Sequence, residues 1–398
     1  MTDGKLKLGR NVISLGAVSF FTDVASEMMY PLLPVFLASV LGASASFIGV
    51  IEGTAESVAA LLKLASGWWS DRVKSRKGLV LVGYVLASVV RPFTAATHTA
   101  AQVLGIRVTD RIGKGIRSTP RDALIAESVD PSIRGRAFGF HSAADNAGAV
   151  VGPLIAFGVL YYWHTPLRTV FWLTAIPGGI AVLVLWFFVK DIPHAVTAEG
   201  RPRLFGADLS GRFWAYLAVV FAFTLGNSTD AFLLLRARQL GVPIVLAPVL
   251  WALLNFVKSA TGTYGGSLSD RIGRKPLIVG GWLLYAAVYL AFGIAHTAWQ
   301  AWVLFAVYGV FYGMTEGTEK AMVVDIVPSQ RKGTALGWYN LAIGIGALPA
   351  SLIFGAIWDR AGAPGAFMFG AAMAFVASIG MMLVGPSSGQ QQRLPGRL

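Results

Sequence analysis

The side chains best suited to chemistry in this sequence are charges that interrupt stretches otherwise apolar enough to cross a bilayer. Placing one charge at the bilayer centre costs about 3 kcal/mol, so leaving eighteen in lipid would cost roughly 50 kcal/mol. We therefore expect them to face a cavity, to pair with one another, or to reach the interface from helix ends. They are Asp23, Glu27, Glu52, Glu56, Asp110, Asp145, Asp230, Glu316 and Glu319, with Lys63, Arg91, Arg107, Arg111, Lys114, Arg117, Arg236, Lys258 and Lys320.

Asp23 and Glu27 are the most informative pair. Their i,i+4 spacing places both on one face of a helix, near the middle of the first apolar stretch. Two carboxylates so close repel each other, which suits a group that takes up and releases a proton or attracts a cation. The alternative is structural pairing with Arg107 or Arg111 of the fourth stretch.

The remaining candidates for a substrate or proton cavity lie in both halves of the chain. Arg111 is the candidate for holding a carboxylate. Glu316 and Lys320 are four residues apart and can neutralise each other, which leaves Glu319 to find another partner such as Lys258. The cavity set is Asp23, Glu27, Glu56, Arg111, Asp145, Asp230, Glu316, Glu319 and Lys320.

A metal site receives only weak support. His141 and Asp145 have the i,i+4 spacing of a ligand pair, but this signal is weak, so we predict no resident metal. A transported metal cation could use Asp23, Glu27, His141, Asp145 and Met28. The chain has no Cys, which removes thiolate ligands and argues against a soft metal. It also lacks a Walker loop, a serine nucleophile elbow and a His-Glu-x-x-His motif, so we expect no cofactor and no enzyme activity.

Composition identifies the elements that must position these charges. Of 398 residues, 55% are hydrophobic and 13% charged, against about 25% charged in soluble domains. A bilayer core of about 30 Å needs about 20 apolar residues per helix, and about twelve such stretches are present. The fourth and tenth are weakened by charges. The expected ranges are 11–38, 47–69, 78–97, 101–122, 137–160, 169–189, 213–237, 246–268, 277–295, 299–325, 334–357 and 364–384.

The distribution of basic residues predicts the orientation. Even-numbered loops and the two termini hold 21 of the 33 Lys and Arg, whereas the opposite loops hold Arg168, Arg238 and Arg360. Basic residues remain cytoplasmic, so both termini should face the cytoplasm in the inner membrane. The net charge of +13 is then explained by anionic lipid headgroups, and no nucleic-acid partner is expected.

The two halves of the chain are repeats. Asp71 and Asp270 stand in matching motifs 199 residues apart, and Gly135 and Gly333 are 198 apart. The register holds over about 100 residues, which indicates a duplication. We expect a six-helix bundle over 1–189, a cytoplasmic linker over 190–212, a second bundle over 213–385 and a tail over 386–398.

Several motifs resemble those of the major facilitator superfamily. Gly67-x-x-x-Asp71-Arg72 with Arg76-Lys77, and Gly266-x-x-x-Asp270-Arg271-x-Gly273-Arg274-Lys275, are similar to its loop motif between helices 2–3 and 8–9. The first copy carries one inserted residue. Arg111-x-x-Lys114-Gly115 resembles the helix-4 arginine motif. Gly148-x-x-x-Gly152-Pro153 resembles, in part, the motif of proton-coupled exporters.

The resemblance implies an all-α membrane protein of about twelve helices in two pseudo-symmetric bundles, with gating by Asp71, Arg72, Arg76, Asp270, Arg271, Arg274, Gly152 and Pro153. The alternatives for these residues are loop solvation and helix packing. The leading function is a proton-coupled secondary transporter, acting as a monomer and exporting cationic or amphipathic compounds by alternating access. A divalent metal-cation exporter, and a non-transport protein such as a lipid scramblase or sensor, are the alternatives.

Overall fold

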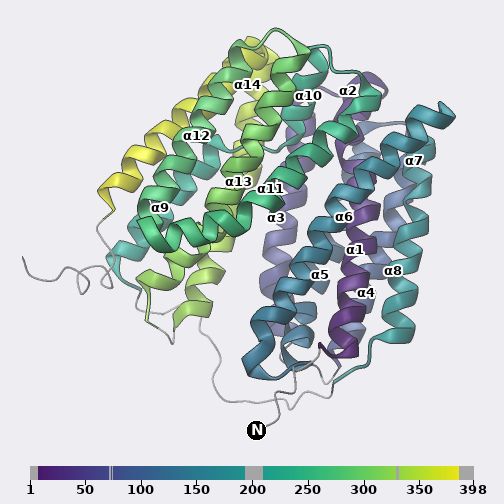
Figure 1. Ribbon diagram of the computed structural model, residues 1–398. Coiled ribbons are helices and arrows are strands. Elements are labelled where there is room, and N and C mark those ends of the chain that lie inside the picture. Colours follow the sequence, from purple (N-terminus) through teal and green to yellow (C-terminus); the bar gives the residue numbers. More distant parts are fainter. Residues whose placement is uncertain (1–7, 71–72, 74, 193–208, 329–330, 385–398) are drawn as a thin grey trace, which may run out of the picture. The chain divides into compact units, whose positions relative to one another are not determined.

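The computed structural model describes residues 8–70, 73, 75–192, 209–328 and 331–384. Within these residues the secondary structure is entirely helical. The helices, labelled in Figure 1, occupy the ranges in which the sequence predicts membrane spans.

The first six spans come from eight α-helices and three short 3-10 turns. The elements are α1 (Arg10–Met29), η1 (Tyr30–Leu32), α2 (Leu33–Ser39), α3 (Ala45–Ser70), α4 (Arg76–Val90), η2 (Arg91–Ala96), α5 (Ala100–Glu127), η3 (Pro131–Ile133), α6 (Arg134–Trp163), α7 (Leu167–Leu173) and α8 (Ala175–Phe188). α1 and α2 form one span, and α7 and α8 form another. Gly148 and Gly152 of α6 allow its backbone to approach α1 closely.

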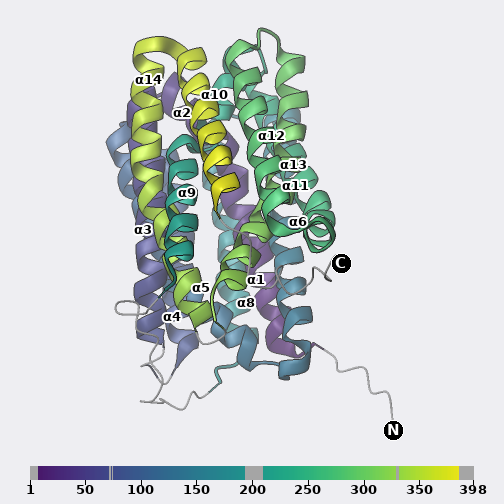
Figure 2. The same ribbon diagram turned by 90° about the vertical axis from the view of Figure 1, so that its left-hand side faces the viewer.

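The last six spans follow the same plan. They are built from α9 (Gly211–Gly226), α10 (Ala231–Gln239), η4 (Ile244–Leu246), α11 (Ala247–Ile272), α12 (Arg274–Ile294), α13 (Ala298–Ile326) and α14 (Lys332–Leu383). α14 contains two spans that meet at Gly362, whose φ of 73° lies in the left-handed region and is followed by Pro364. Figure 2 shows the two arms of α14 side by side.

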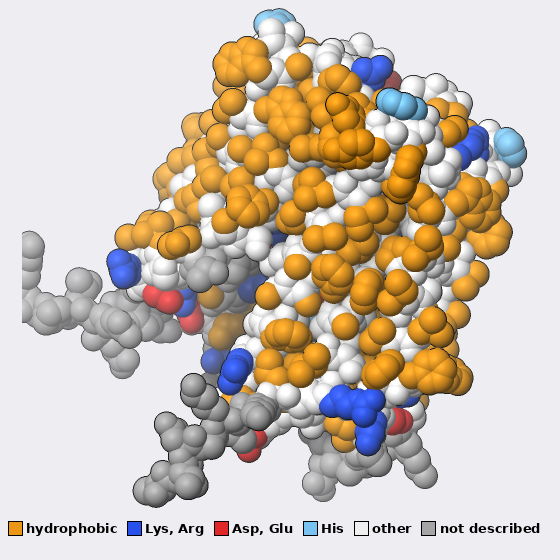
Figure 3. Space-filling view, turned by 45° about the vertical axis from the view of Figure 1, so that its right-hand side comes forward, with side chains coloured by type: hydrophobic (Ala, Val, Ile, Leu, Met, Phe, Trp, Pro, Cys, Tyr) orange, Lys and Arg blue, Asp and Glu red, His pale blue; other side chains and the backbone are white. Residues whose placement is uncertain are grey.

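Within the part of the chain that the structure describes, nine helical stretches are long and apolar enough to cross a membrane by length and composition. α5 and α13, the fourth and tenth spans, do not reach that threshold because of the charges they carry. Both are nevertheless continuous helices of 28 and 29 residues. Hydrophobic side chains cover much of the surface seen in Figure 3, as expected for helices that face lipid.

The chain forms two compact units. Unit 1 comprises residues 1–43, 54–198 and 243–255, and unit 2 comprises residues 44–53, 199–242 and 256–398. Each unit therefore includes a short segment from the other half of the sequence, 243–255 in unit 1 and 44–53 in unit 2. The core of unit 1 gathers Val12, Leu15, Val18, Val80, Tyr84, Leu124, Ile125, Ala137, Ala181, Leu185 and Val189.

Equivalent contacts in the two units reflect the duplication. Thr99 and Gln102 form a capping box at the start of α5, and Thr297 and Gln300 form one at the start of α13. Lys77 Nζ donates to the carbonyl of Trp186 at 2.9 Å, near the end of α8. At the corresponding position, 198 residues later, Lys275 Nζ donates to the carbonyls of Met382 and Val384, each at 2.6 Å.

Candidate functional site

Asp23 lies on the part of α1 that faces α6, and Glu27 lies one turn further along α1. A Cβ atom added at Gly148 of α6 would lie 2.9 Å from the Asp23 Cβ, so the two helices meet at this acid. The charged groups acting on Asp23 include the carboxylates of Glu27 and Asp145 and the ammonium of Lys114. The structure therefore groups three of the predicted acids in unit 1.

Glu27 has a neutral partner that the sequence did not suggest. The indole of Trp251 donates a hydrogen bond from Nε1 to Glu27 Oε2 at 2.6 Å, and the Trp251 ring packs on Tyr30 with centroids 4.9 Å apart. Trp251 belongs to the 243–255 segment of unit 1. The contact joins residues 224 positions apart, and no local pattern marks such a pair.

Arg111 holds a carboxylate, which is the role expected of it. Its guanidinium lies 3.0 Å from Glu56 Oε1, with the Arg111 side chain nearly buried and the Glu56 side chain 46% exposed. The partner is Glu56 of α3, whereas the structural alternative had been pairing with Asp23 or Glu27. Glu56 lies near the middle of α3, so this ion pair stands deep within a span.

A second ion pair in unit 1 is fully buried and was not assigned to any role. Arg91 donates to Asp110 Oδ1 at 2.7 Å, and Arg107 lies 3.8 Å from Asp110 Oδ2. All three side chains are at most 4% exposed. Arg91 also reaches the carbonyl of Thr22 on α1 at 3.5 Å, so the group connects α1, η2 and α5.

His141 and Asp145 form a pair on α6. His141 Nδ1 lies 3.5 Å from Asp145 Oδ2, which confirms that the i,i+4 spacing brings them together. In the residues that the structure describes, no group of three or more His, Cys, Asp or Glu side chains could hold a metal ion.

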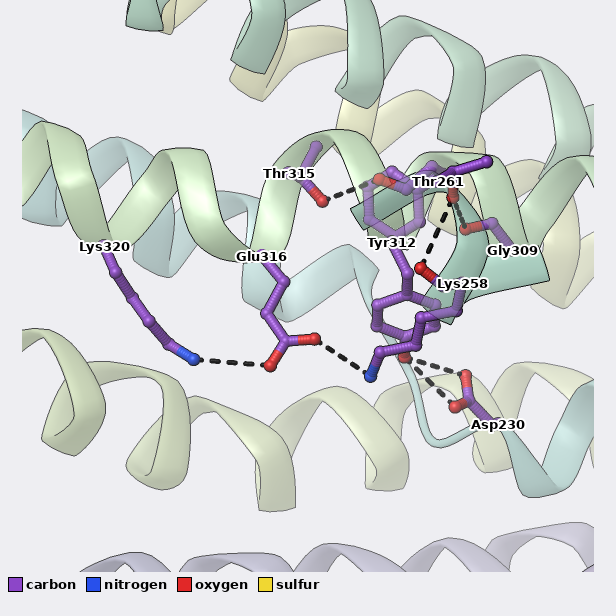
Figure 4. Close-up of polar contacts among 9 residues, drawn as sticks. Asp230, Lys258, Thr261, Gly309, Tyr312, Thr315, Glu316 and Lys320 are labelled. Atoms are coloured by element: carbon purple, nitrogen blue, oxygen red, sulfur yellow. Dashed lines mark hydrogen bonds and ion pairs between the residues drawn. The ribbon is translucent and has the colours of Figure 1, made fainter. Parts of the chain in front are cut away.

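Unit 2 contains a row of alternating charges (Figure 4). Lys320 Nζ lies 3.3 Å from Glu316 Oε1, and Lys258 Nζ lies 2.9 Å from Glu316 Oε2. The expected neutralisation of Glu316 by Lys320 is thus present, but Lys258 shares it. Glu316 and Lys320 are about half exposed, although both lie within the span formed by α13.

Asp230, the N-cap residue of α10, accepts hydrogen bonds from two phenols. Tyr308 donates to Asp230 Oδ1 at 2.8 Å, and Tyr312 donates to Asp230 Oδ2 at 3.1 Å. Lys258 Nζ lies 4.6 Å from the centroid of the Tyr312 ring. Tyr312 therefore connects the carboxylate of Asp230 with the ammonium of Lys258.

Glu319 has a different partner from the one considered from the sequence. Its carboxylate accepts hydrogen bonds from Trp282 Nε1 at 2.8 Å and from the Tyr339 hydroxyl at 2.7 Å. Lys258 is engaged with Glu316 instead. Glu319 is buried and lies among aromatic side chains of α12 and α14.

The loop-motif residues contact the helices of their own unit. Arg76 forms an ion pair with Glu127 at the end of α5, and Arg274 lies 3.3 Å from Asp325 at the end of α13. Arg274 also pairs with Asp270 at 2.6 Å, and Arg271 is exposed. Asp71 and Arg72 lie outside the described residues.

Gly152 and Pro153 are buried where α6 meets α1. A Cβ at Gly152 would lie 2.6 Å from the Val24 carbonyl oxygen and 3.2 Å from the Met28 nitrogen. Both contacted atoms are backbone, so only glycine fits this crossing. The partial exporter motif therefore packs on the turn of α1 that carries Asp23 and Glu27.

Comparisons with known proteins agree with this architecture. The family model of the Major Facilitator Superfamily matches residues 15–261 and 255–397. An uncharacterised MFS-type transporter of Methanocaldococcus jannaschii is 31% identical over 384 residues, covering 95% of this chain and 96% of that protein. The multidrug resistance protein MdtH of Shigella dysenteriae is 34% identical, but over 93 residues and 23% of each chain.

A solved structure supports the same fold. The crystal structure of the nucleoside transporter NupG superposes with a TM-score of 0.80 at 13% sequence identity, covering 94% of this chain and 99% of that one. The twelve spans, the matching contacts of the two units and the family match over most of the sequence lead to one conclusion. The chain belongs to the major facilitator superfamily, and it is a membrane transporter.

Proposed function

We propose that this protein is a proton-coupled secondary transporter that exports cationic or amphipathic small molecules from the cytoplasm by alternating access. It resides in the cytoplasmic membrane as a monomer, with both termini on the cytoplasmic side. The proposal joins the family assignment to the charges within the spans.

The observation that carries this proposal is a set of partly exposed ion pairs deep within helices. Glu56 is 46% exposed beside Arg111, and Glu316 is 47% exposed beside Lys258. Contact of these charges with lipid would cost about 3 kcal/mol each. We infer that these side chains face water, so each unit has a wet, charged face within its own spans.

The acids of α1 support coupling to protons. Asp23, Glu27 and Asp145 lie close together in unit 1, and crowded carboxylates favour uptake of a proton by one of them. The motif that resembles those of proton-coupled exporters packs against this same turn of α1. The similarity to the multidrug resistance protein MdtH, although short, also favours export.

Proton flux in liposomes tests this proposal. Purified protein is reconstituted, a dye reports internal pH, and candidate cations, amphipathic drugs and small anions are added in turn. We expect cationic or amphipathic compounds to drive proton movement in the wild-type protein. Combined substitution Asp23→Asn and Glu27→Gln should abolish that movement, because both amides keep the shape of the acids and cannot release a proton.

The matched control is Glu52→Gln, which removes a buried acid on α3 outside the proposed proton group. It should retain most of the flux. Proton movement that survives in the Asp23→Asn, Glu27→Gln protein would exclude these acids as the coupling site. Substrate uptake without proton movement would show a uniporter, and movement of labelled lipid alone would favour a scramblase.

A further inference from the structure

The seventh span is interrupted at the position of Asp230. α9 ends at Gly226, residues 227–230 are not helical, and α10 begins at Ala231. Backbone that is not helical persists within a membrane only where protein or a water-filled cavity surrounds it. In transporters such broken helices commonly form substrate sites.

Asp230 directs its carboxylate away from its own helix. It occupies the N-cap position of α10 without a side-chain capping bond and instead accepts the hydroxyls of Tyr308 and Tyr312. The Tyr308 and Tyr312 rings pack edge to face, with centroids 5.1 Å apart. An organic ammonium ion binds where a carboxylate and the face of an aromatic ring are both within reach, and the Tyr312 ring offers such a face beside its hydroxyl bond to Asp230.

An ammonium group of the protein already occupies part of this arrangement. Lys258 Nζ lies over the Tyr312 ring, on the residue whose hydroxyl binds Asp230 (Figure 4). The same ammonium has a second partner in Glu316, at 2.9 Å. Lys258 can therefore remain paired with Glu316 when a ligand cation occupies the position over the Tyr312 ring.

We propose that Asp230, Tyr308 and Tyr312 form the binding site for the ammonium group of the transported compound, and that Lys258 is a built-in competitor for it. The inference rests on the proposed function and assigns its substrate to a specific site in unit 2. Lys258 already pairs with Glu316 while it lies over the Tyr312 ring, so a ligand cation that takes the place over the ring leaves Lys258 with Glu316 as its partner. Departure of the ligand lets Lys258 return to the ring.

Equilibrium binding to purified protein in nanodiscs tests this proposal. The probe is benzyltrimethylammonium, measured by calorimetry, with benzenesulfonate as an aromatic anion of similar size. Substitution Lys258→Met should lower the Kd for benzyltrimethylammonium about tenfold, a change of about 1.4 kcal/mol, because the competing cation is lost. Benzenesulfonate should gain nothing.

Lys320→Met is the matched control. Lys320 pairs with Oε1 of the same Glu316 whose Oε2 pairs with Lys258, but among the described residues it lies over no aromatic ring, so its loss should change the Kd less than about threefold. Lys258→Arg keeps a cation and should not improve binding. In the wild-type protein, Asp230→Asn should weaken binding about tenfold, and this variant provides the test if Lys258→Met does not fold.

The outcomes separate this site from the wider proposal. Equal gains from Lys258→Met and Lys320→Met would mean a general charge effect and would overturn the competitor role. Unchanged affinity in Asp230→Asn would overturn the site. The measurement uses no gradient, so loss of proton coupling leaves it unaffected. Proton-coupled transport of other solutes, with no binding of benzyltrimethylammonium by any variant, would reject this inference alone.

Discussion

Substitution Asp110→Asn is expected to lower the free energy of unfolding of unit 1 by about 3 kcal/mol or more. Removing one member of a buried ion pair leaves the other charge without compensation, and such losses typically reach 3–5 kcal/mol. Asp110 lies between Arg91 and Arg107, and all three side chains are buried. Tryptophan fluorescence during thermal unfolding in detergent should show a melting temperature lower by roughly 10 °C.

A double substitution separates the ion pair from packing. Combining Arg91→Met with Asp110→Leu replaces the 2.7 Å ion pair by apolar groups of similar size, which is often close to neutral, while Arg107 keeps its position over the Tyr30 ring. This protein should therefore regain at least half of the stability that Asp110→Asn loses. If the Asp110→Asn protein has the same melting temperature as the wild type, burial of the Arg91 and Arg107 charges does not require this carboxylate.

Substitution Gly152→Ala is expected to separate α6 from α1 and to remove most of the transport. The added Cβ would meet the carbonyl oxygen of Val24 at 2.6 Å and its Cα at 3.0 Å. Backbone atoms cannot change rotamer as a side chain can, so the two helices must move apart. This movement should lower the free energy of unfolding by about 1–3 kcal/mol. Asp23 and Glu27 lie on the displaced helix, so substrate-driven proton flux is the measurement.

Gly158→Ala on the same helix is the control. A Cβ at Gly158 has no heavy atom within 4 Å, so this change should leave flux intact and raise helix stability by at most about 1 kcal/mol. Full transport by the Gly152→Ala protein would contradict the account of this helix crossing as the support for the acids of α1.

Much of the fold could be predicted from the sequence because lipid imposes a simple rule on spans. Runs of apolar residues predicted where the spans lie, and the 198–199-residue repeat predicted that the two halves share one plan. α5 and α13 were correctly retained although their charges weaken the hydropathy signal. The exchange of segments 44–53 and 243–255 between the units was not predicted, since it depends on contacts between distant parts of the chain.

For the candidate site, residue types could be predicted but partners could not. Local spacing correctly joined Glu316 to Lys320 and His141 to Asp145, because a helix brings residues i and i+4 together. Contacts between helices could not be predicted, because they depend on how segments distant in the sequence pack together. Arg111 meets Glu56, and Glu319 is held by Trp282 and Tyr339.

Neutral partners were missed for a physical reason. Trp251 binds Glu27, and Tyr308 and Tyr312 bind Asp230. Aromatic side chains fill the interior of any helical bundle, so their presence in a sequence does not reveal which hydroxyl or indole faces an acid. The break in the seventh span beside Asp230 was the available signal, since the run Gly-Asn-Ser-Thr-Asp over 226–230 favours non-helical backbone.

Labelling of single cysteines tests whether the charged helix faces within the spans are accessible to water, and whether that access alternates between the two sides of the membrane. The natural chain has no Cys, so single cysteines report without background. Glu56→Cys and Lys320→Cys mark the two charged faces. Val376→Cys is the control, because the side chain of Val376 is apolar and 58% exposed on α14 and should face lipid.

Membrane-impermeant maleimide is applied separately from each side of oriented vesicles. We expect the cysteines at positions 56 and 320 to react with the maleimide, and the cysteine at position 376 not to react. The side of the membrane from which positions 56 and 320 react should change when a transported compound or a proton gradient is imposed. Reaction at all three positions alike, or none at 56 and 320 from either side under any condition, would contradict this expectation.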